Sequence, residues 1–258
     1  SLEKDDLRVL ELERWHDFGA FEAALMRPGP WVAALDFPFG QSRTFIRNIG
    51  WPHEWSAYVK QVGTMTRAEF RNQLDAYRKD RAPGDKEHRR KMDVAAGSTS
   101  PQKLYGVPVG LMFFEGAPRL LASGVTLPGI ADGDPDRLAV EAYPGALARH
   151  LIGRRSYKND SVDKQTHDQL EARKAILSKL KAGNLLASHG VRVQVDDDIV
   201  DDPGADDLDA LLCAVQAAAA WLRRDRQFGA PRGFEPDEGW IAEPTVYETC
   251  RDEGGTGK

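Results

Sequence analysis

Cysteine is scarce in this sequence: only Cys213 and Cys250 occur among its 258 residues, far apart and outside any CxxC spacing. Two cysteines so placed do not make a disulfide scaffold or a structural zinc site. The six histidines are scattered and include no HExxH pairing, which argues against a histidine-built metal centre. A metal ion bound to this chain would therefore be a hard cation with oxygen ligands.

The sequence also lacks a long apolar run and a strong excess of one charge. No run is long enough to cross a bilayer, and no signal-peptide pattern stands at the start, so we expect a cytoplasmic protein with no membrane partner. The net charge of −5 does not mark a nucleic-acid binder, although a local basic patch can still attract phosphate. The apolar fraction of 41% and the charged fraction of 29% are typical of a globular protein.

Segments typical of strands alternate with segments typical of helices. Leu7 to Trp15, LRVLELERW, alternates apolar and charged residues, as a half-buried strand does. Asp17 then caps a helix, and residues 31–35, WVAAL, show no polar alternation, which is typical of a strand covered on both faces. Strand, helix and parallel strand would make one βαβ step, and RLAVEAYPG, Arg137 to Gly145, gives a further strand. The pattern predicts an α/β fold.

The remaining segments complete the expected organisation, a single domain over residues 1–258. Residues 41–95 mix aromatic and charged side chains and are expected to form two or three surface helices, inserted beside the sheet. Helices are also predicted at 110–124, interrupted by Pro118, at 164–183 and at 206–225, with a short strand at 190–196, an extended segment at 239–248 and a disordered tail near 251–258.

Asp36 ends the apolar run at 31–35 and is followed at once by Phe37 and Pro38. Because Pro38 cannot donate to a β-ladder, the strand must stop near it. Asp36 is therefore expected at the carboxyl end of a central strand, the edge where open α/β sheets place their ligands. The alternative is that Asp36 only caps the following turn.

Three further acids are candidates for the same site. Glu141 points to the opposite strand face from Leu138 and Val140, and an acid within an apolar strand must face solvent, a cation or a basic partner. Asp206 and Asp209 are three residues apart and share one helical face. The alternatives are a salt bridge for Glu141 and helix capping for the two aspartates.

Together, Asp36, Glu141, Asp206 and Asp209 are carboxylates on separate elements that one sheet could bring together. Clustered carboxylates repel one another unless cations neutralise them. Such a set can hold two Mg²⁺ ions about 3.5–4 Å apart, which clamp the attacking and leaving oxygens of a phosphodiester. We expect Asp36, Asp206 and Asp209 to bind the metal and all four acids to serve catalysis.

Basic residues gather between Tyr77 and Asp93, in YRKDRAPGDKEHRRKMD. We predict that Arg90 or Lys91 holds the scissile phosphate, because such a cluster attracts a phosphate backbone. Interspersed acids make a solvated surface loop the alternative. A smaller cluster comprises Arg154, Arg155, Tyr157 and Lys158, a pairing of basic and aromatic residues that suits single strands.

Four separated blocks carry a family resemblance: ALDFPFG, GLMFFEGAPRLLASG, VEAYPGALARHL and DDLDALLCAVQAA. Together they resemble the DUF429 family, proteins of unknown function predicted to be nucleases with an RNase H-like fold, over roughly Leu7 to Trp240. The resemblance implies a mixed sheet flanked by helices and a Mg²⁺ or Mn²⁺ site. It matches Asp36 to the acid after the central strand, Glu141 to the Glu before Tyr-Pro, and Asp206 and Asp209 to the helical acids.

The start of the sequence departs from this pattern. RNase H-like folds begin with a hairpin whose first strand supplies a principal metal-binding aspartate, and family members usually have a "GIDF"-like strand there. Only SLEKDD precedes Leu7, and Asp5 and Asp6 do not follow an apolar strand. We therefore expect either a truncated chain or a protein without that strand, in both cases one acid short.

The expected function is metal-dependent hydrolysis of phosphodiester bonds, with nucleic acid as the partner. The alternative is a non-catalytic binding or scaffold protein that keeps the fold, which the missing first acid favours. A small-molecule phosphotransferase on a related fold is a third possibility, but no glycine-rich phosphate loop supports it.

Overall fold

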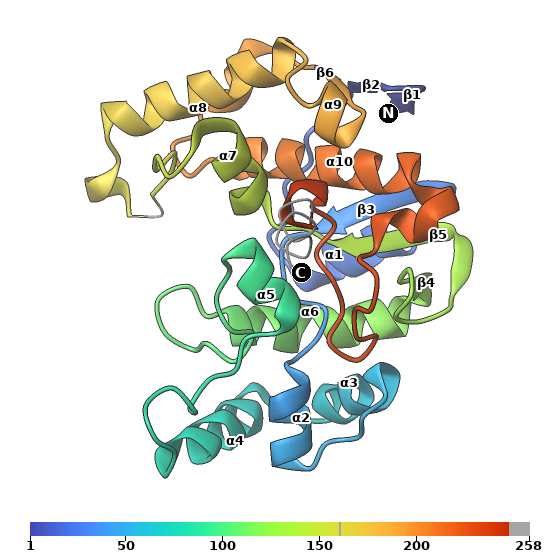
Figure 1. The fold of residues 1–258 in the computed structure, drawn as a ribbon, viewed down its shortest axis with the longest axis vertical. Helices are drawn as coiled ribbons and strands as arrows, with labels where there is room; N and C mark the ends of the chain where they lie inside the picture. Colours follow the sequence, from blue (N-terminus) through green and yellow to red (C-terminus); the bar gives the residue numbers. More distant parts are fainter. Residues whose placement is uncertain (160, 248–258) are drawn as a thin grey trace, which may run out of the picture. The chain divides into compact units, whose positions relative to one another are not determined.

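The computed structural model describes residues 1–159 and 161–247 (Figure 1). Cys250 and the disordered tail predicted near 251–258 lie outside these residues. None of the helices formed by the described residues has the length and apolar character that crossing a bilayer requires. Within these residues, helices flank two small sheets, so the α/β class predicted from the sequence is confirmed.

The chain divides into two compact units. The β3–β5 unit comprises residues 15–141 and 230–241, and the α10 unit comprises residues 1–14, 142–229 and the described residues from 242 onward. Each unit has a hydrophobic core of its own and, among the described residues, a three-stranded sheet of its own.

The sheet of the β3–β5 unit is parallel throughout its described strands, in the order β3-β5-β4. Its strands are β3 (Trp31–Leu35), β4 (Val125–Thr126) and β5 (Asp134–Glu141). β3 and β5 pair in register from Trp31 opposite Arg137 to Leu35 opposite Glu141, and they run side by side in Figure 1. The strands predicted from WVAAL and RLAVEAYPG are thus confirmed, and both point their carboxyl ends to the same edge.

Helices build most of the core of this unit. They are α1 (Phe18–Leu25), α2 (Arg43–Ile49), α3 (Trp55–Gly63), α4 (Arg67–Lys79), α5 (Lys91–Ala96) and α6 (Val109–Ser123). Asp17 caps α1 through its side chain, as predicted, and Thr66 opens α4 with a capping box. The helices predicted between 41 and 95 are present as α2 to α5. These helices bury one face, on which Tyr58 and Phe70 are fully buried, whereas other residues such as Lys60 and Arg71 are exposed.

The helix predicted at 110–124 continues through Pro118 instead of breaking there. Proline removes one intrahelical hydrogen bond, yet buried neighbours hold α6 together on both sides of it. The backbone of Gly63, at the end of α3, lies close enough that an added Cβ would be 3.2 Å from the Cβ of Pro118. Close helix packing therefore outweighs the local preference of proline.

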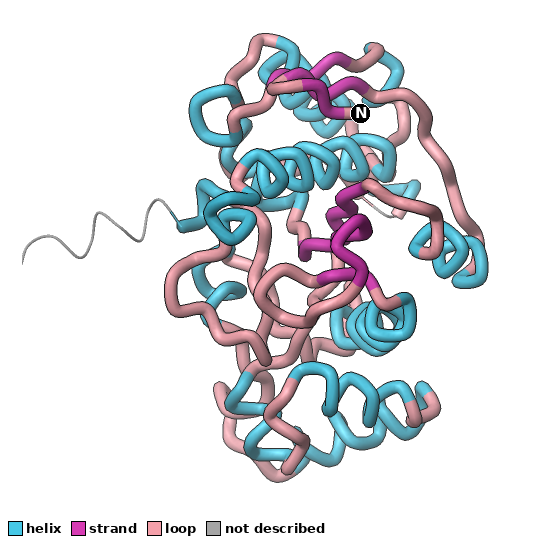
Figure 2. The backbone as a smooth tube through the Cα atoms, turned by 90° about the vertical axis from the view of Figure 1, so that its right-hand side faces the viewer, coloured by secondary structure: helices cyan, strands magenta, loops and turns pink. Residues whose placement is uncertain are grey.

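The α10 unit packs helices around the long alanine-rich helix that gives it its name. Its elements are β1 (Leu2–Glu3), β2 (Asp6–Arg8), α7 (Pro144–Ile152), η1 (Val162–Lys164), α8 (His167–Lys181), α9 (Leu186–His189), β6 (Arg192–Gln194), η2 (Asp197–Val200), α10 (Asp206–Leu222) and η3 (Arg224–Gly229). Figure 2 shows the helices as cyan coils. The amphipathic helix predicted at 164–183 is α8, and it buries Ile176, Leu177 and Leu180. β2 pairs with β1 antiparallel and with β6 parallel.

The strand predicted over Leu7 to Trp15 is wrong for most of its length. Only Asp6–Arg8 is a strand, and residues 9–14 form no regular element. β2 belongs to the sheet with β1 and β6, so it does not form a βαβ step with β3. The apolar alternation misled because Leu10 and Leu12 are 72% and 45% exposed, and so they mark no buried strand face.

The segment predicted as extended at 239–248 is extended only at its start. Ile241 makes an isolated parallel bridge with Glu141, whereas residues 244–247 are helical. Within the β3–β5 unit, this bridge brings the segment 230–241 beside the carboxyl end of β5.

Candidate functional site

Two of the four predicted acids lie at one edge of the β3–β5 sheet. Leu35 and Glu141 are register partners at the last position of β3 and β5, and Asp36 is the next residue after Leu35. Asp36 is exposed. The aromatic ring of Phe37 packs against α6 so tightly that a Cβ on Gly116 would lie 2.3 Å from its Cε2. The turn that carries Asp36 is therefore held in place by the contact of Phe37 with α6.

Glu141 is not exposed; it is part of a buried ion network with Arg90 and Asp93. Its Oε1 accepts from Arg90 Nη2 at 2.5 Å, and its Oε2 accepts from Arg90 Nη1 at 2.7 Å and from the Phe39 backbone N–H at 2.8 Å. The same guanidinium donates from Nε and Nη2 to the two oxygens of Asp93, at 2.9 and 2.7 Å. The three side chains are 1–3% exposed, so water does not compete for these bonds.

The network holds one cation between two carboxylates. Burial lowers the pKa of Arg90, but Asp93 and Glu141 outweigh it and raise that pKa well above its ordinary value. Burial also raises the pKa of Glu141, because a single guanidinium cannot fully compensate two buried carboxylates. Arg90, which the sequence analysis assigned to a substrate phosphate, instead has its guanidinium enclosed by this network and by the Glu238 carbonyl, 3.0 Å from Nη1.

Lys91, the neighbouring residue predicted to bind phosphate, lies at the surface with its side chain 65% exposed. Its Nζ is 3.2 Å from Glu235 Oε1. The other oxygen of that carboxylate, Oε2, is 2.7 Å from Nη1 of Arg43. Arg43 also donates from Nε and Nη2 to Asp237 at 2.8 and 2.5 Å. Arg43 was not among the predicted residues, because nothing near it in the chain marks it as part of a basic cluster.

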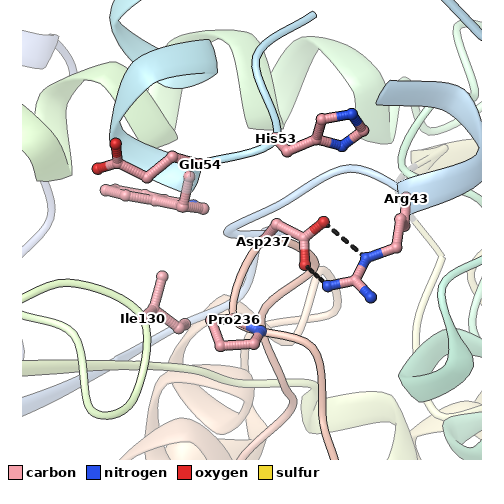
Figure 3. Close-up of a pocket in the computed structure, with 7 residues that line it drawn as sticks. Arg43, His53, Glu54, Ile130, Pro236 and Asp237 are labelled. Carbon is pink, nitrogen blue, oxygen red and sulfur yellow. Dashed lines mark hydrogen bonds and ion pairs between the residues drawn. The ribbon is translucent and has the colours of Figure 1, made fainter. Parts of the chain in front are cut away.

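A cavity of about 460 Å³ opens beside this arginine (Figure 3). Its lining comprises Arg43, His53, Glu54, Trp55, Ile130, Pro236 and Asp237. Figure 3 shows two nitrogens of Arg43 turned to the carboxylate of Asp237 and the third turned away from it. The hydrogen bonds that Arg43 donates to Asp237 raise the pKa of Arg43, so the guanidinium stays charged.

The other two predicted acids lie in the α10 unit, near the start of α10. Asp209 accepts from the Tyr157 hydroxyl at 2.7 Å and from Lys158 Nζ at 2.5 Å. Burial raises the pKa of Asp209, and Lys158 opposes that rise. Asp206 is exposed in the first turn. The N-cap of α10 is Ala205, so neither aspartate caps this helix with its side chain.

A second buried polar cluster in the α10 unit was not predicted. His189 Nε2 is 3.0 Å from Glu243 Oε1, and Gln216 donates to Glu243 Oε2 at 2.7 Å. Burial tends to raise the pKa of Glu243, but hydrogen bonds from His189, Gln216 and Thr245 lower it. These residues are far apart in sequence and match no motif, so no local signal could have joined them.

The four acids differ in how well they suit a metal ion. Asp36 and Asp206 are exposed, so a hydrated cation can reach them from solvent. Both oxygens of Glu141 and both oxygens of Asp209 already accept from neighbouring groups, including a cationic side chain in each case. Within residues 1–159 and 161–247, no group of three or more His, Cys, Asp or Glu side chains is arranged to hold a metal.

Comparison with known proteins identifies a family. The model described as "Protein of unknown function (DUF429)" matches residues 2–232, a span that includes Asp36, Glu141, Asp206 and Asp209. Neither the curated proteins nor the solved structures contain a match to this sequence. Since the family match extends over most of the sequence, the chain belongs to the DUF429 family.

Proposed function

We propose that this protein hydrolyses phosphodiester bonds of nucleic acid with the help of Mg²⁺ or Mn²⁺. The observation that supports this most is the placement of Asp36 and Glu141 at the shared carboxyl edge of the parallel pair β3 and β5. That edge is where α/β sheets place ligands. The resemblance to proteins predicted to be RNase H-like nucleases gives the reaction type, which is an argument by analogy of fold.

Asp36 is the carboxylate we assign to the metal in this unit. It is exposed, and Phe37 fixes its turn against α6. A bound divalent cation would supply an activated water and neutralise the leaving oxygen. Glu141 acts as a positioning residue: its Oε2 accepts from the Phe39 backbone N–H at 2.8 Å and so holds the turn that follows Asp36.

Lys91 is the residue of the predicted pair that can reach a phosphate, since its side chain is 65% exposed. Its ammonium would neutralise a phosphate oxygen as a point charge. Asp206 and Asp209 remain proposed metal ligands of the α10 unit. Asp206 is exposed, whereas Asp209 would have to release Lys158 or Tyr157 first.

A second function, non-catalytic binding on the same fold, is favoured by one observation. Two of the four acids, Glu141 and Asp209, are bonded to Arg90 and Lys158, which neutralise them without any metal. A protein that had lost catalysis could keep such pairs as structural contacts. Loss of the Asp36 carboxylate distinguishes the two functions, because it would abolish cleavage by a nuclease but would remove no activity from a binding protein.

The test is the Asp36→Asn variant, assayed for Mn²⁺-dependent cleavage of a panel of single- and double-stranded DNA and RNA. A metal ligand at Asp36 predicts at least about a hundredfold loss of cleavage, because the interaction supplies several kcal/mol in the transition state. The free energy of unfolding of wild type and variant, measured in parallel, separates the loss of a metal ligand from the loss of a structural contact.

The matched control is Asp132→Asn, which removes an exposed aspartate near the opposite, amino end of β5. It should leave cleavage unchanged. If the wild-type protein binds members of the panel and cleaves none, the binding function replaces the nuclease. Equal cleavage by wild type and Asp36→Asn would remove Asp36 from the mechanism.

A further inference from the structure

One carboxylate in the β3–β5 unit bridges two cations near the surface. Glu235 Oε2 is 2.7 Å from Arg43 Nη1, and Glu235 Oε1 is 3.2 Å from Lys91 Nζ. The side chains of Arg43 and Lys91 are 43% and 65% exposed, and that of Glu235 is 27% exposed. Each oxygen of one anionic group thus meets a different cation, although the three residues are far apart in sequence.

The two cations are not equally mobile. Arg43 is oriented by the two bonds to Asp237, whose side chain is only 7% exposed (Figure 3). Asp237 is itself anchored, because its carbonyl accepts from the buried Tyr58 hydroxyl at 2.7 Å. The guanidinium therefore presents Nη1 away from Asp237 in a fixed direction, whereas Lys91 can follow a ligand on its flexible stem.

The bond between Glu235 and this pair is easy to exchange. Partly exposed ion pairs contribute little net stability, because solvent screens them and ordering long side chains costs entropy. The backbone of Glu235 is held separately, since its carbonyl accepts from the N–H groups of Glu238 and Gly239 at 2.9 and 3.1 Å. The carboxylate can swing away while the segment 230–241 stays in place.

We propose that Arg43 and Lys91 form a binding site for a phosphate group of a nucleic-acid chain, and that the Glu235 carboxylate occupies this site until the ligand displaces it. A phosphodiester, like a carboxylate, carries one negative charge that is shared by two oxygens able to accept hydrogen bonds. Arginine and lysine are the usual partners of such oxygens. The identity of the ligand as nucleic acid rests on the proposed function; the phosphate site itself does not.

Of the two neighbouring basic residues Arg90 and Lys91, only Lys91 has a side chain that a ligand in solvent can reach. Arg90 is enclosed by Glu141 and Asp93, and the next residue along the chain reaches outward to Glu235. Glu235 then works as a competing anion: it lowers affinity for phosphate and selects ligands that contact both cations. Contacts of this kind position a chain without reading its sequence.

Equilibrium binding of a short fluorescent single-stranded oligonucleotide, with EDTA present so that cleavage cannot interfere, tests the site. Glu235→Gln should bind about fivefold more tightly than wild type, because the competing carboxylate is gone. Arg43→Gln and Lys91→Gln should each bind more weakly and reduce the slope of log affinity against log salt concentration by about 1. The matched control, Glu22→Gln, removes the same charge from a surface pair with Arg119 and should not change affinity.

Competition with inorganic phosphate distinguishes the source of the phosphate group. If phosphate displaces the oligonucleotide, and more so in Glu235→Gln, the site recognises the phosphate group itself. If inorganic phosphate binds with the same dependence on Glu235 but no oligonucleotide does, the ligand is a small phosphate compound, which overturns the nucleic-acid part of the proposal. Equal affinities of wild type, Glu235→Gln and Glu22→Gln overturn the site.

These results are independent of catalysis. The expected pattern of affinities together with no cleavage by any form would leave the phosphate site standing and remove the nuclease. Cleavage that depends on Asp36, without any effect of Glu235, Arg43 or Lys91 on binding, would do the reverse. A thermal melt of each variant shows whether an affinity change reflects the site or a loss of fold.

Discussion

The two units each join carboxylates to a cation, but they do so at different depths. In the β3–β5 unit, Arg90, Glu141 and Asp93 are 1–3% exposed and bonded on every side. In the α10 unit, Lys158 is 35% exposed and Asp209 is 12% exposed. The arginine is locked between two acids, whereas the lysine holds one acid and still reaches water. The buried cluster around Arg90 therefore supports the fold, whereas the more exposed pair of Lys158 and Asp209 can still separate and bind other groups.

The type of basic residue also differs between the two clusters: arginine occupies the buried one and lysine the partly exposed one. Arginine offers five donors in a rigid plane, which suits a buried network with several acceptors. Lysine is a flexible point charge, which suits a contact that forms and breaks. Of the two acids, Asp209 is thus the one that could release its cation for a metal, and Glu141 is the one that holds a turn in place.

The largest expected effect comes from removing the buried cation. Arg90→Met should lower the free energy of unfolding by about 3–5 kcal/mol, because Glu141 and Asp93 would remain buried without a counter-charge. Urea denaturation at neutral pH measures the loss. The control, Arg81→Met, removes an arginine whose ion pair with Asp85 lies at the surface, and it should cost about 1 kcal/mol or less.

A triple variant of the same network sharpens this result. Arg90→Met combined with Glu141→Gln and Asp93→Asn removes all three charges, and much of the lost stability should return. If the triple variant is no more stable than Arg90→Met, lost packing and hydrogen bonds, not unpaired charge, account for the cost.

Asp209→Asn should have an intermediate effect, about 1–2 kcal/mol, because it replaces one of the two oxygens that accept from Tyr157 and Lys158 with an NH2 group. Burial raises the pKa of Asp209 in the folded protein. An acid whose folded pKa is raised contributes most stability below its unfolded pKa of about 3.9 and loses that contribution as pH rises through the folded value. The cost of the substitution should therefore fall as the pH rises above about 4. Urea denaturation of both proteins across this range measures it, and a cost that grows with pH would contradict the direction.

The smallest effect is expected for Lys158→Met, about 1 kcal/mol, because Asp209 keeps its bond to Tyr157 and some access to water. The same variant should raise the pKa of Asp209 further, which NMR titration of the carboxyl carbon can follow. Lys174→Met, which breaks the exposed pair with Glu171, is the control. If Lys158→Met lowers the free energy of unfolding as much as Arg90→Met does, the proposed difference in stability contribution between the two clusters is wrong.

The parts of the fold that the sequence predicted are those with a local signal. The apolar run at Trp31–Leu35, the cap at Asp17 and the stripe on α8 are each decided by residues near one another in the chain. The sheet that β2 joins was not predictable in this way. Its partner β6 lies far along the chain, and the alternation through Leu10 and Leu12 suggested a longer strand.

The candidate site was predictable to a similar extent. The positions of Asp36 and Glu141 at strand ends follow from Pro38 and from the apolar residues before each acid. The burial of Arg90 does not, since its neighbours Arg89 and Lys91 look the same in sequence and only Arg90 meets Glu141 and Asp93. Arg43 and Glu235 are brought together by the fold from distant parts of the chain.

The position of Asp36 depends on helix α6, because the ring of the next residue, Phe37, packs against Gly116 in that helix. Any side chain at Gly116 would meet the ring at 2.3 Å and displace it, and with it the residue immediately before it in the chain. The acid could thus be moved without altering a single charge, from a helix that carries no candidate functional residue. A substitution can therefore change the position of Asp36 without replacing any acidic residue. The size of the side chain at position 116 in α6 is enough.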